Sequence, residues 1–134
     1  MIKEVLNPNT VAKPIRPTFS QAVKVAGRTF LFISGQVSVD KYGNTVGKGD
    51  IVIQTKQVLE NIRAIVEAAG GTMNDIVKIT VYLVDMKYFD DVHKVRAEYF
   101  KEEPPASTLV QVSRLVSPDW LIEIDAVAVL DNKR

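Results

Sequence analysis

Hydrophobic positions between Asp50 and Gly70 repeat every three or four residues, and this spacing predicts a helix. Asp50 can cap the start of this helix, and the Gly70–Gly71 pair can end it. Residues 86–100 show similar spacing and predict a second helix, which Pro104 and Pro105 end. The apolar stripe of the first helix comprises Val58, Ile62, Ile65, Val66 and Ala69.

Alternation of apolar and polar residues, together with an apolar run at Phe30–Ile33, predicts five strands, at residues 20–25, 29–34, 75–84, 108–114 and 120–130. Gly27 suits a tight hairpin between the first two strands. The sequence Ser117-Pro118-Asp119 predicts that the last two strands pair with each other. Three prolines make residues 7–19 an extended segment, and glycines mark residues 38–49 as a loop.

This order of elements predicts a single α+β domain covering residues 1–134. One mixed sheet would carry two helices packed on one face. Two helices cannot cover both faces, so the other face must meet solvent or another subunit.

Composition narrows the classes of function. The 17 basic and 16 acidic residues give a net charge of +1, which offers no broad electrostatic surface for nucleic acid or an anionic membrane. The absence of cysteine excludes a thiolate nucleophile and sulfur-ligated zinc, and the single histidine is His93. The longest apolar run, Ala126–Leu130, is far too short to span a membrane, and the N-terminus lacks a signal-peptide pattern. We expect a cytoplasmic protein that binds no metal.

Two carboxylates on the last predicted strand are candidates for chemistry. Glu123 and Asp125 share a face with apolar neighbours, about 6.6–6.8 Å apart along the strand. If that face is covered, one of them could serve as a proton donor or as a base for water; if it is open, both are simply hydrated. The glycines of residues 43–49 fit neither a P-loop nor a dinucleotide fingerprint, which favours a surface loop. His93 lies on the second helix, where a lone histidine is more often solvated or interfacial than catalytic.

Four segments resemble the Rid/YjgF family, the reactive intermediate imine deaminases, which is also called the endoribonuclease L-PSP or translation-inhibitor family. The similarity runs from about Ser20 to Leu130 and keeps the order of the elements. The segments are Phe-Ile-Ser-Gly-Gln-Val at 32–37, Asn-Ile-Arg-Ala-Ile-Val-Glu-Ala-Ala-Gly at 61–70, Asp-Ile-Val-Lys at 75–78 and Ile-Glu-Ile at 122–124.

The resemblance implies a chorismate-mutase-like subunit that assembles as a homotrimer, with the three sheets forming a central barrel. It also implies that a small-molecule substrate binds in clefts between subunits. Active members hydrolyse enamines and imines, such as 2-aminoacrylate, to a keto acid and ammonia, and they use no cofactor.

The resemblance also assigns site residues. Glu123 matches the glutamate that positions water, and Ser107 stands where the family signature Pro-Ala-Arg-Ser/Thr has the arginine that binds the substrate carboxylate. We therefore expect Glu123 and Ser107 to be catalytic. Arg96 or Arg114 could supply the missing charge, although the geometry of neither is obviously suitable. The substrate-binding residues implied by the same comparison are Phe19, Ser34, Gly35, His93, Thr108 and Leu109.

These observations favour a deaminase that acts on an atypical imine or enamine because the carboxylate-binding arginine is replaced. The alternative is a non-catalytic ligand-binding or regulatory member of the family. An endoribonuclease is less favoured, because the chain has no basic surface with interleaved aromatic residues.

Overall fold

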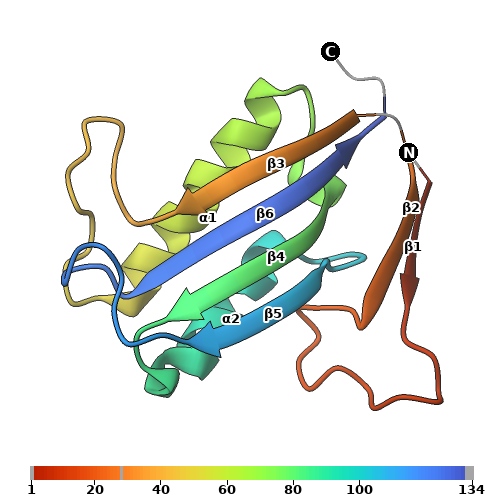
Figure 1. The fold of residues 1–134 in the computed structure, drawn as a ribbon, viewed down its shortest axis with the longest axis horizontal. Coiled ribbons are helices and arrows are strands. Elements are labelled where there is room, and N and C mark those ends of the chain that lie inside the picture. Colours follow the sequence, from red (N-terminus) through yellow and green to blue (C-terminus); the bar gives the residue numbers. More distant parts are fainter. Residues whose placement is uncertain (1, 28, 132–134) are drawn as a thin grey trace.

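The computed structural model describes residues 2–27 and 29–131, which form a mixed four-stranded sheet, two α-helices and a separate two-stranded ribbon (Figure 1). The strand order in the sheet is β3-β6-β4-β5, with β4 and β5 parallel and the other pairs antiparallel. The elements are β1 (Ile2–Leu6), β2 (Ala22–Ala26), β3 (Thr29–Gln36), α1 (Ile51–Ala68), β4 (Ile76–Leu83), α2 (Phe89–Tyr99), β5 (Ala106–Gln111) and β6 (Ile122–Leu130), with short 3-10 turns at Met73–Asp75 and Met86–Tyr88.

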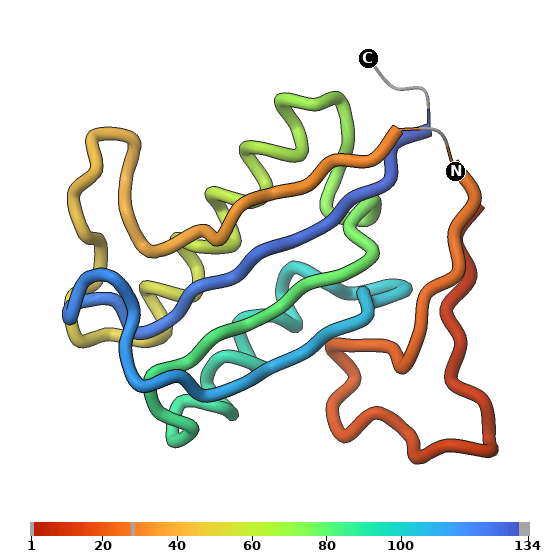
Figure 2. The backbone as a smooth tube through the Cα atoms, in the orientation of Figure 1, coloured from red at the N-terminus to blue at the C-terminus, as the bar shows by residue number. Residues whose placement is uncertain are grey.

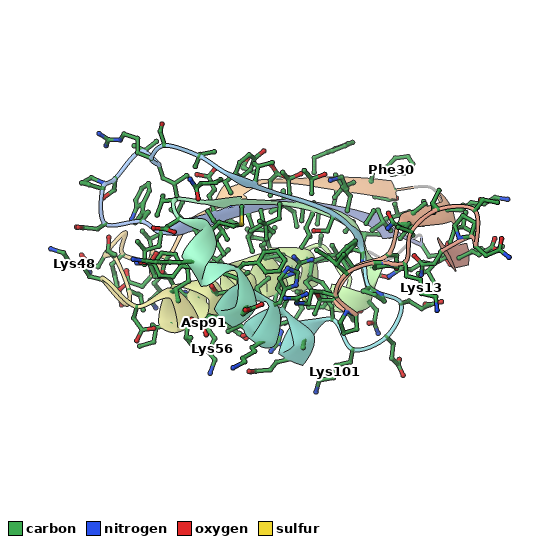
Figure 3. The ribbon with its side chains drawn as sticks, turned by 90° about the horizontal axis from the view of Figure 1, so that it is seen from below. Lys13, Phe30, Lys48, Lys56, Asp91 and Lys101 are labelled. Carbon is green, nitrogen blue, oxygen red and sulfur yellow. The ribbon has the colours of Figure 1, made fainter. Side chains whose placement is uncertain are left out.

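Both helices lie on the same face of the sheet, as the edge-on view of Figure 3 shows. Figure 1 places α1 behind β3 and β6, and α2 behind β4 and β5. The predicted α+β class, with a mixed sheet and two helices on one face, is confirmed. The opposite face is covered by neither helix, and Figure 3 shows Phe30 on that side.

Local sequence signals set the ends of α1 as expected. The carboxylate of Asp50 accepts a hydrogen bond from the backbone N–H of Ile53 at 3.0 Å, and Gly70 takes a φ of 89° just beyond the helix. The predicted apolar stripe is turned toward the sheet, because Val58, Ile62 and Val66 are fully buried. Burial of this stripe, more than helix propensity, stabilises the helix.

The strand β6 forms the centre of the core. Its even-numbered residues from Ile122 to Leu130 are buried beneath the helices, as the alternation predicted. In β4 the predicted inward face holds from Ile79 to Leu83, but a register irregularity between Ile76 and Lys78 buries Ile76 in place of Val77.

The predicted pairing of the last two strands is wrong. The strand β4 lies between β5 and β6, and the strand partner of β5 is β4, in parallel. The helix α2 returns the chain to the end of the sheet where β4 began, so the next strand runs parallel to β4. Residues 112–121 are then a connection that passes β4, and β6 begins at Ile122 instead of Trp120.

The predicted hairpin around Gly27 is also wrong. The strand β2 pairs with β1, in a ribbon outside the main sheet, while β3 pairs with β6. The sequence pattern predicted no strand at Ile2–Leu6, so the true partner of β2 was missing from the prediction. Arg28, at the predicted turn, lies outside the described residues.

The extended segment between β1 and β2 reaches the edge of the sheet at β5, a path that Figure 2 traces from the red end of the chain. Ser20 fixes this approach, because its backbone N–H donates to the carbonyl of Pro105 at 3.0 Å and its hydroxyl donates to the carbonyl of Pro104 at 2.7 Å. An isolated parallel bridge joins Ser20 to Ala106. These contacts bring Thr18 and Phe19 beside β5 and α2.

Candidate functional site

Four of the predicted site residues line one small cavity between β5, α2 and the segment before Ser20. The cavity has a volume of about 170 Å³. Strand β5 contributes Ser107 and Leu109, and the other two are Phe19 and His93. The remaining walls are Ile15, Phe89 and Arg96.

His93 is buried in the wall of this cavity, with an exposed fraction of 6%. Its Nδ1 lies 2.6 Å from the hydroxyl oxygen of Thr18, and its ring packs on Phe89 with centroids 4.5 Å apart. Burial lowers the pKa of His93 to about 4, aided by the positive charges of Arg96 and Arg16. Asp90 opposes this shift weakly, so the imidazole is neutral near pH 7.

Arg96 is completely buried and bonded to a predicted site residue. Its Nη2 donates to the hydroxyl oxygen of Ser107 at 3.1 Å and to the carbonyl of Thr18 at 3.4 Å. Burial lowers the pKa of Arg96 to about 10. Of the two arginines considered from sequence, Arg96 reaches the cavity, whereas Arg114 donates to the carbonyls of Leu115 and Val116.

A second group of predicted residues lies on the sheet face that the helices leave uncovered. Glu123 of β6 packs directly against Gly35 of β3, and a side chain at position 35 would collide with the Glu123 carboxylate. Ser34 adjoins Gly35 in the same strand. On the neighbouring strand, the Tyr82 hydroxyl donates to Asp125 at 3.2 Å, and the charge of Asp125 raises the pKa of Tyr82.

Thr108 belongs with this second group. Strand alternation points it away from Ser107 and Leu109, and it accepts a hydrogen bond from the ammonium of Lys78 at 3.0 Å. The predicted residues therefore form two groups on opposite faces of one sheet. Within a single chain, Glu123 and Ser107 do not meet.

The first group is completed by three residues that were not predicted as site residues from sequence, Thr18, Ile15 and Phe89. No local signal marks them, because their contacts depend on where residues 7–19 cross the sheet edge. For Arg96, its position in the sequence did indicate a special role. It falls on the apolar face of the predicted helix, where a charged side chain must find a buried partner.

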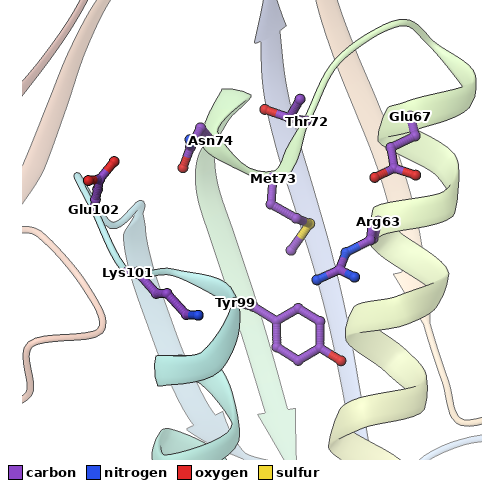
Figure 4. A pocket seen from close by; sticks show the side chains of 8 residues that line it. All are labelled: Arg63, Glu67, Thr72, Met73, Asn74, Tyr99, Lys101 and Glu102. Carbon is purple, nitrogen blue, oxygen red and sulfur yellow. The ribbon is translucent and has the colours of Figure 1, made fainter.

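A wider cavity of about 400 Å³ lies near the C-terminal ends of α1 and α2, away from both groups (Figure 4). Two of its lining residues, Arg63 and Tyr99, contact each other and Glu60, which lies outside the lining. Arg63 stacks on the Tyr99 ring at 5.0 Å and pairs with Glu60, and the Tyr99 hydroxyl donates to Glu60 at 2.7 Å. None of the predicted site residues lies in its lining.

Residues 2–27 and 29–131 contain neither a membrane-spanning helix nor a metal-binding cluster. No helix in these ranges is both long and apolar enough to cross a membrane. No cluster of three or more histidine, aspartate or glutamate side chains there could hold a metal ion.

The fold and the two residue groups define a class of small α+β proteins with an uncovered sheet face and site residues on strand ends. The family model described as Endoribonuclease L-PSP matches residues 10–130, and the chain belongs to this family, which includes the Rid and RutC proteins. A RutC family protein of Pyrococcus horikoshii is 52% identical over 127 residues, covering 95% of this chain and 98% of that protein.

Solved structures agree with this assignment. The Rid family protein YyfB of Yersinia pestis is 34% identical, with a TM-score of 0.90 over 97% of this chain and 100% of that one. RidA from the Antarctic bacterium Psychrobacter is 37% identical, with a TM-score of 0.71 over 89% of this chain and 94% of that one.

Proposed function

We propose that this protein hydrolyses small imines or enamines, with Glu123 as the residue that activates water. The observation that carries the proposal is the fit between Glu123 and Gly35. The absence of a side chain at position 35 leaves the Glu123 carboxylate room on the uncovered sheet face. Membership of the Rid family and the similarity to a solved RidA support the same chemistry.

The reaction needs one base and one water molecule. Water adds to the carbon of the C=N bond, the C–N bond breaks, and ammonia leaves, so that an imino acid and water give a 2-oxo acid and ammonia. A carboxylate such as Glu123 can take the proton of the attacking water and return it to the leaving nitrogen. Ser107, His93, Phe19 and Leu109 would hold the substrate.

The two groups of residues require a second copy of the chain. Because Glu123 and Ser107 lie on opposite sheet faces, we propose that the Glu123 group of one subunit meets the Ser107 group of another. In a homotrimer whose sheets form a central barrel, the edge strand β5 of one subunit would lie beside the uncovered sheet face of the next, where the two groups can meet. Such an assembly would also cover the exposed side chains of Phe30 and Phe32.

A ligand-binding role without catalysis is the second candidate. It is favoured by the first group of residues, which combines a buried cation with a neutral histidine in an apolar cavity. For the ribonuclease activity that the family name suggests, the net charge of +1 offers little electrostatic basis.

The test is an assay in which a pyridoxal-phosphate dehydratase generates 2-aminoacrylate from serine and the release of 2-oxo acid is timed with and without this protein. We expect the protein to accelerate release, and Glu123→Gln to lose at least about 100-fold of that acceleration, as for removal of a general base. Ser113→Ala, a change in the connection after β5, is the matched control. An unchanged rate for Glu123→Gln would overturn the assigned role, and no acceleration by the parent would favour the ligand-binding candidate.

A further inference from the structure

Arg96 combines complete burial with incomplete hydrogen bonding. It is the largest fully buried side chain among the described residues, yet its Nε and Nη1 have no hydrogen-bond acceptor there. Among the same residues, no carboxylate forms an ion pair with it. Buried arginines in proteins are normally paired, because an isolated cation loses far more hydration energy than neutral hydrogen bonds return.

The guanidinium borders the cavity beside β5, which has the character of a site for a small anion. Phe19, Phe89, Ile15 and Leu109 give it apolar walls, and low polarity strengthens the attraction between a cation and an anion. The volume of about 170 Å³ corresponds to roughly five or six water molecules at ~30 Å³ each.

The neighbouring groups His93 and Arg16 do not supply the positive charge that would bind an anion in this cavity. His93 is neutral near pH 7. Arg16 is engaged with other groups, because it pairs with Asp90 at 2.6 Å and its guanidinium lies over the Phe89 ring, 4.9 Å from the centroid. Arg96 is therefore the cation that an anion in this cavity would meet.

Ser107 adds a second donor. Its oxygen accepts the hydrogen bond from Arg96, which leaves its own O–H proton free to donate. A carboxylate has two oxygens, and it can accept one hydrogen bond from a guanidinium and another from a hydroxyl.

We propose that Arg96 and Ser107 together form a carboxylate subsite, which admits small 2-oxo or 2-imino monocarboxylates with their alkyl group against Phe19 and Leu109. The proposal rests on the proposed function for the choice of ligand. In the family signature the positive charge lies at position 107, on β5. In this chain, Arg96 of the facing helix α2 would supply that charge. The substrate class is then a short, singly charged carboxylate.

The test uses pyruvate as the probe and pyruvamide as its neutral counterpart, which has the same number of non-hydrogen atoms. Isothermal titration calorimetry on the whole protein should show that pyruvate binds at least tenfold more tightly than pyruvamide. Arg96→Met keeps a long apolar side chain without the charge, and it should weaken pyruvate binding about 10- to 100-fold and leave pyruvamide unchanged. Equal affinity for the two ligands, or no detectable binding of pyruvate, would overturn the subsite.

Stability without ligand separates this role from a purely structural one. If Arg96 only ties α2 to β5, Arg96→Met should lower the melting temperature and affect both ligands alike. If it forms the subsite, Arg96→Met should melt no lower than the parent, because an uncompensated buried charge is gone. If Arg96→Met fails to fold, Ser107→Ala provides the test, because it removes one donor at a half-buried position. This variant should weaken pyruvate binding about 3- to 10-fold. No loss in Ser107→Ala would also count against the subsite.

Failure of this inference is distinguishable from failure of the proposed function. Pyruvate binding that depends on Arg96, without any imine hydrolysis, retains the subsite and rejects the hydrolase. Hydrolysis at the same kcat/KM in Arg96→Met and parent retains the hydrolase and rejects the subsite.

Discussion

At the scale of single residues, the environment of His93 has a consequence for acid stability. Its pKa is about 4 in the folded protein and about 6.5 in an unfolded chain, so the unfolded state binds more protons between these values. The contribution of neutral His93 to the free energy of unfolding is fully present above about pH 6.5 and is lost as the pH falls toward 4. The loss should amount to about 1–3 kcal/mol.

Urea unfolding at pH 7.5 and pH 4.5 checks this prediction when the parent is compared with His93→Gln. The parent should lose more stability than the variant over that interval, because glutamine does not titrate. Parallel losses in the two proteins would mean that the histidine is protonated freely in the folded state.

Gly35 offers a second prediction at this scale. A methyl group at position 35 would collide with the end of the Glu123 side chain, which can move aside at little cost. Gly35→Ala should therefore change the free energy of unfolding by less than about 1 kcal/mol. Its imine hydrolysis should fall at least about tenfold, because the carboxylate is displaced.

Measuring the melting temperature and kcat/KM on the same preparation of Gly35→Ala separates the two effects. Full activity in a stably folded variant would show that the position of Glu123 is not critical. A large loss of stability would show that the carboxylate cannot yield.

At the scale of elements, α2 and β5 are coupled through Arg96 and Ser107. Ser107→Arg would bring a second guanidinium to the atom that Arg96 contacts at 3.1 Å, at a half-buried position. This variant should lose at least about 2 kcal/mol of stability. Adding Arg96→Met should recover most of that loss, because a single buried cation remains.

Urea unfolding of the parent, both single variants and the double variant forms a double-mutant cycle that measures this coupling. We expect a coupling free energy above ~1 kcal/mol. Additive effects would show that the two side chains point apart when both are large. Leu109→Met, at a neighbouring position of β5, serves as the volume-conserving control.

Elements with local signals could be predicted from sequence, and pairings between distant segments could not. Asp50 and Gly70, which mark the two ends of α1, lie next to its apolar stripe in the sequence. The position of α1 could therefore be predicted from local signals. The partner of β5 could not be predicted from sequence. A connection such as residues 112–121 can join two neighbouring strands or pass over a strand between them, and its sequence does not distinguish the two cases. The same holds for β2, whose partner precedes it by a stretch of irregular chain.

The candidate site divides in the same way. The family resemblance named Ser107, His93 and Phe19, and the structure brings them to one cavity. It could not reveal the contact between Arg96 and Ser107, because that contact depends on the rotation of α2 about its axis and on its distance from the sheet. It also could not show that Ser107 and Glu123 lie on opposite faces, because the sequence pattern did not assign the two faces of β5.

At the scale of the whole molecule, the uncovered face of the sheet predicts assembly. Phe30 and Phe32 on β3 are 56% and 76% exposed, which is unusual for neighbouring aromatic residues on one strand. Sedimentation equilibrium should give about three times the chain mass of 14.9 kDa. A mass near that of one chain at micromolar concentration would rule out both the trimer and the site between subunits.

A charge on this face should separate the subunits. Phe32→Glu should lower the sedimentation mass toward that of one chain and abolish hydrolysis, because burying a carboxylate between subunits is costly. Val52→Glu, at an exposed position on the helical layer, is the control and should leave both unchanged. An intact trimer in Phe32→Glu would place the contact elsewhere.

The position of β6 bears on how the chain folds as it is synthesised. This strand comes after every other element in the sequence, yet it pairs with both β3 and β4 and contributes the buried residues beneath α1. Until it emerges from the ribosome, β3 has no partner in the main sheet and the apolar stripe of α1 has little to pack against. At 5–20 residues per second, the earlier elements wait for several seconds in a form that exposes apolar surface. Folding of the main sheet therefore waits for the synthesis of β6, and a chain interrupted before Ile122 lacks the strand that joins β3 to β4.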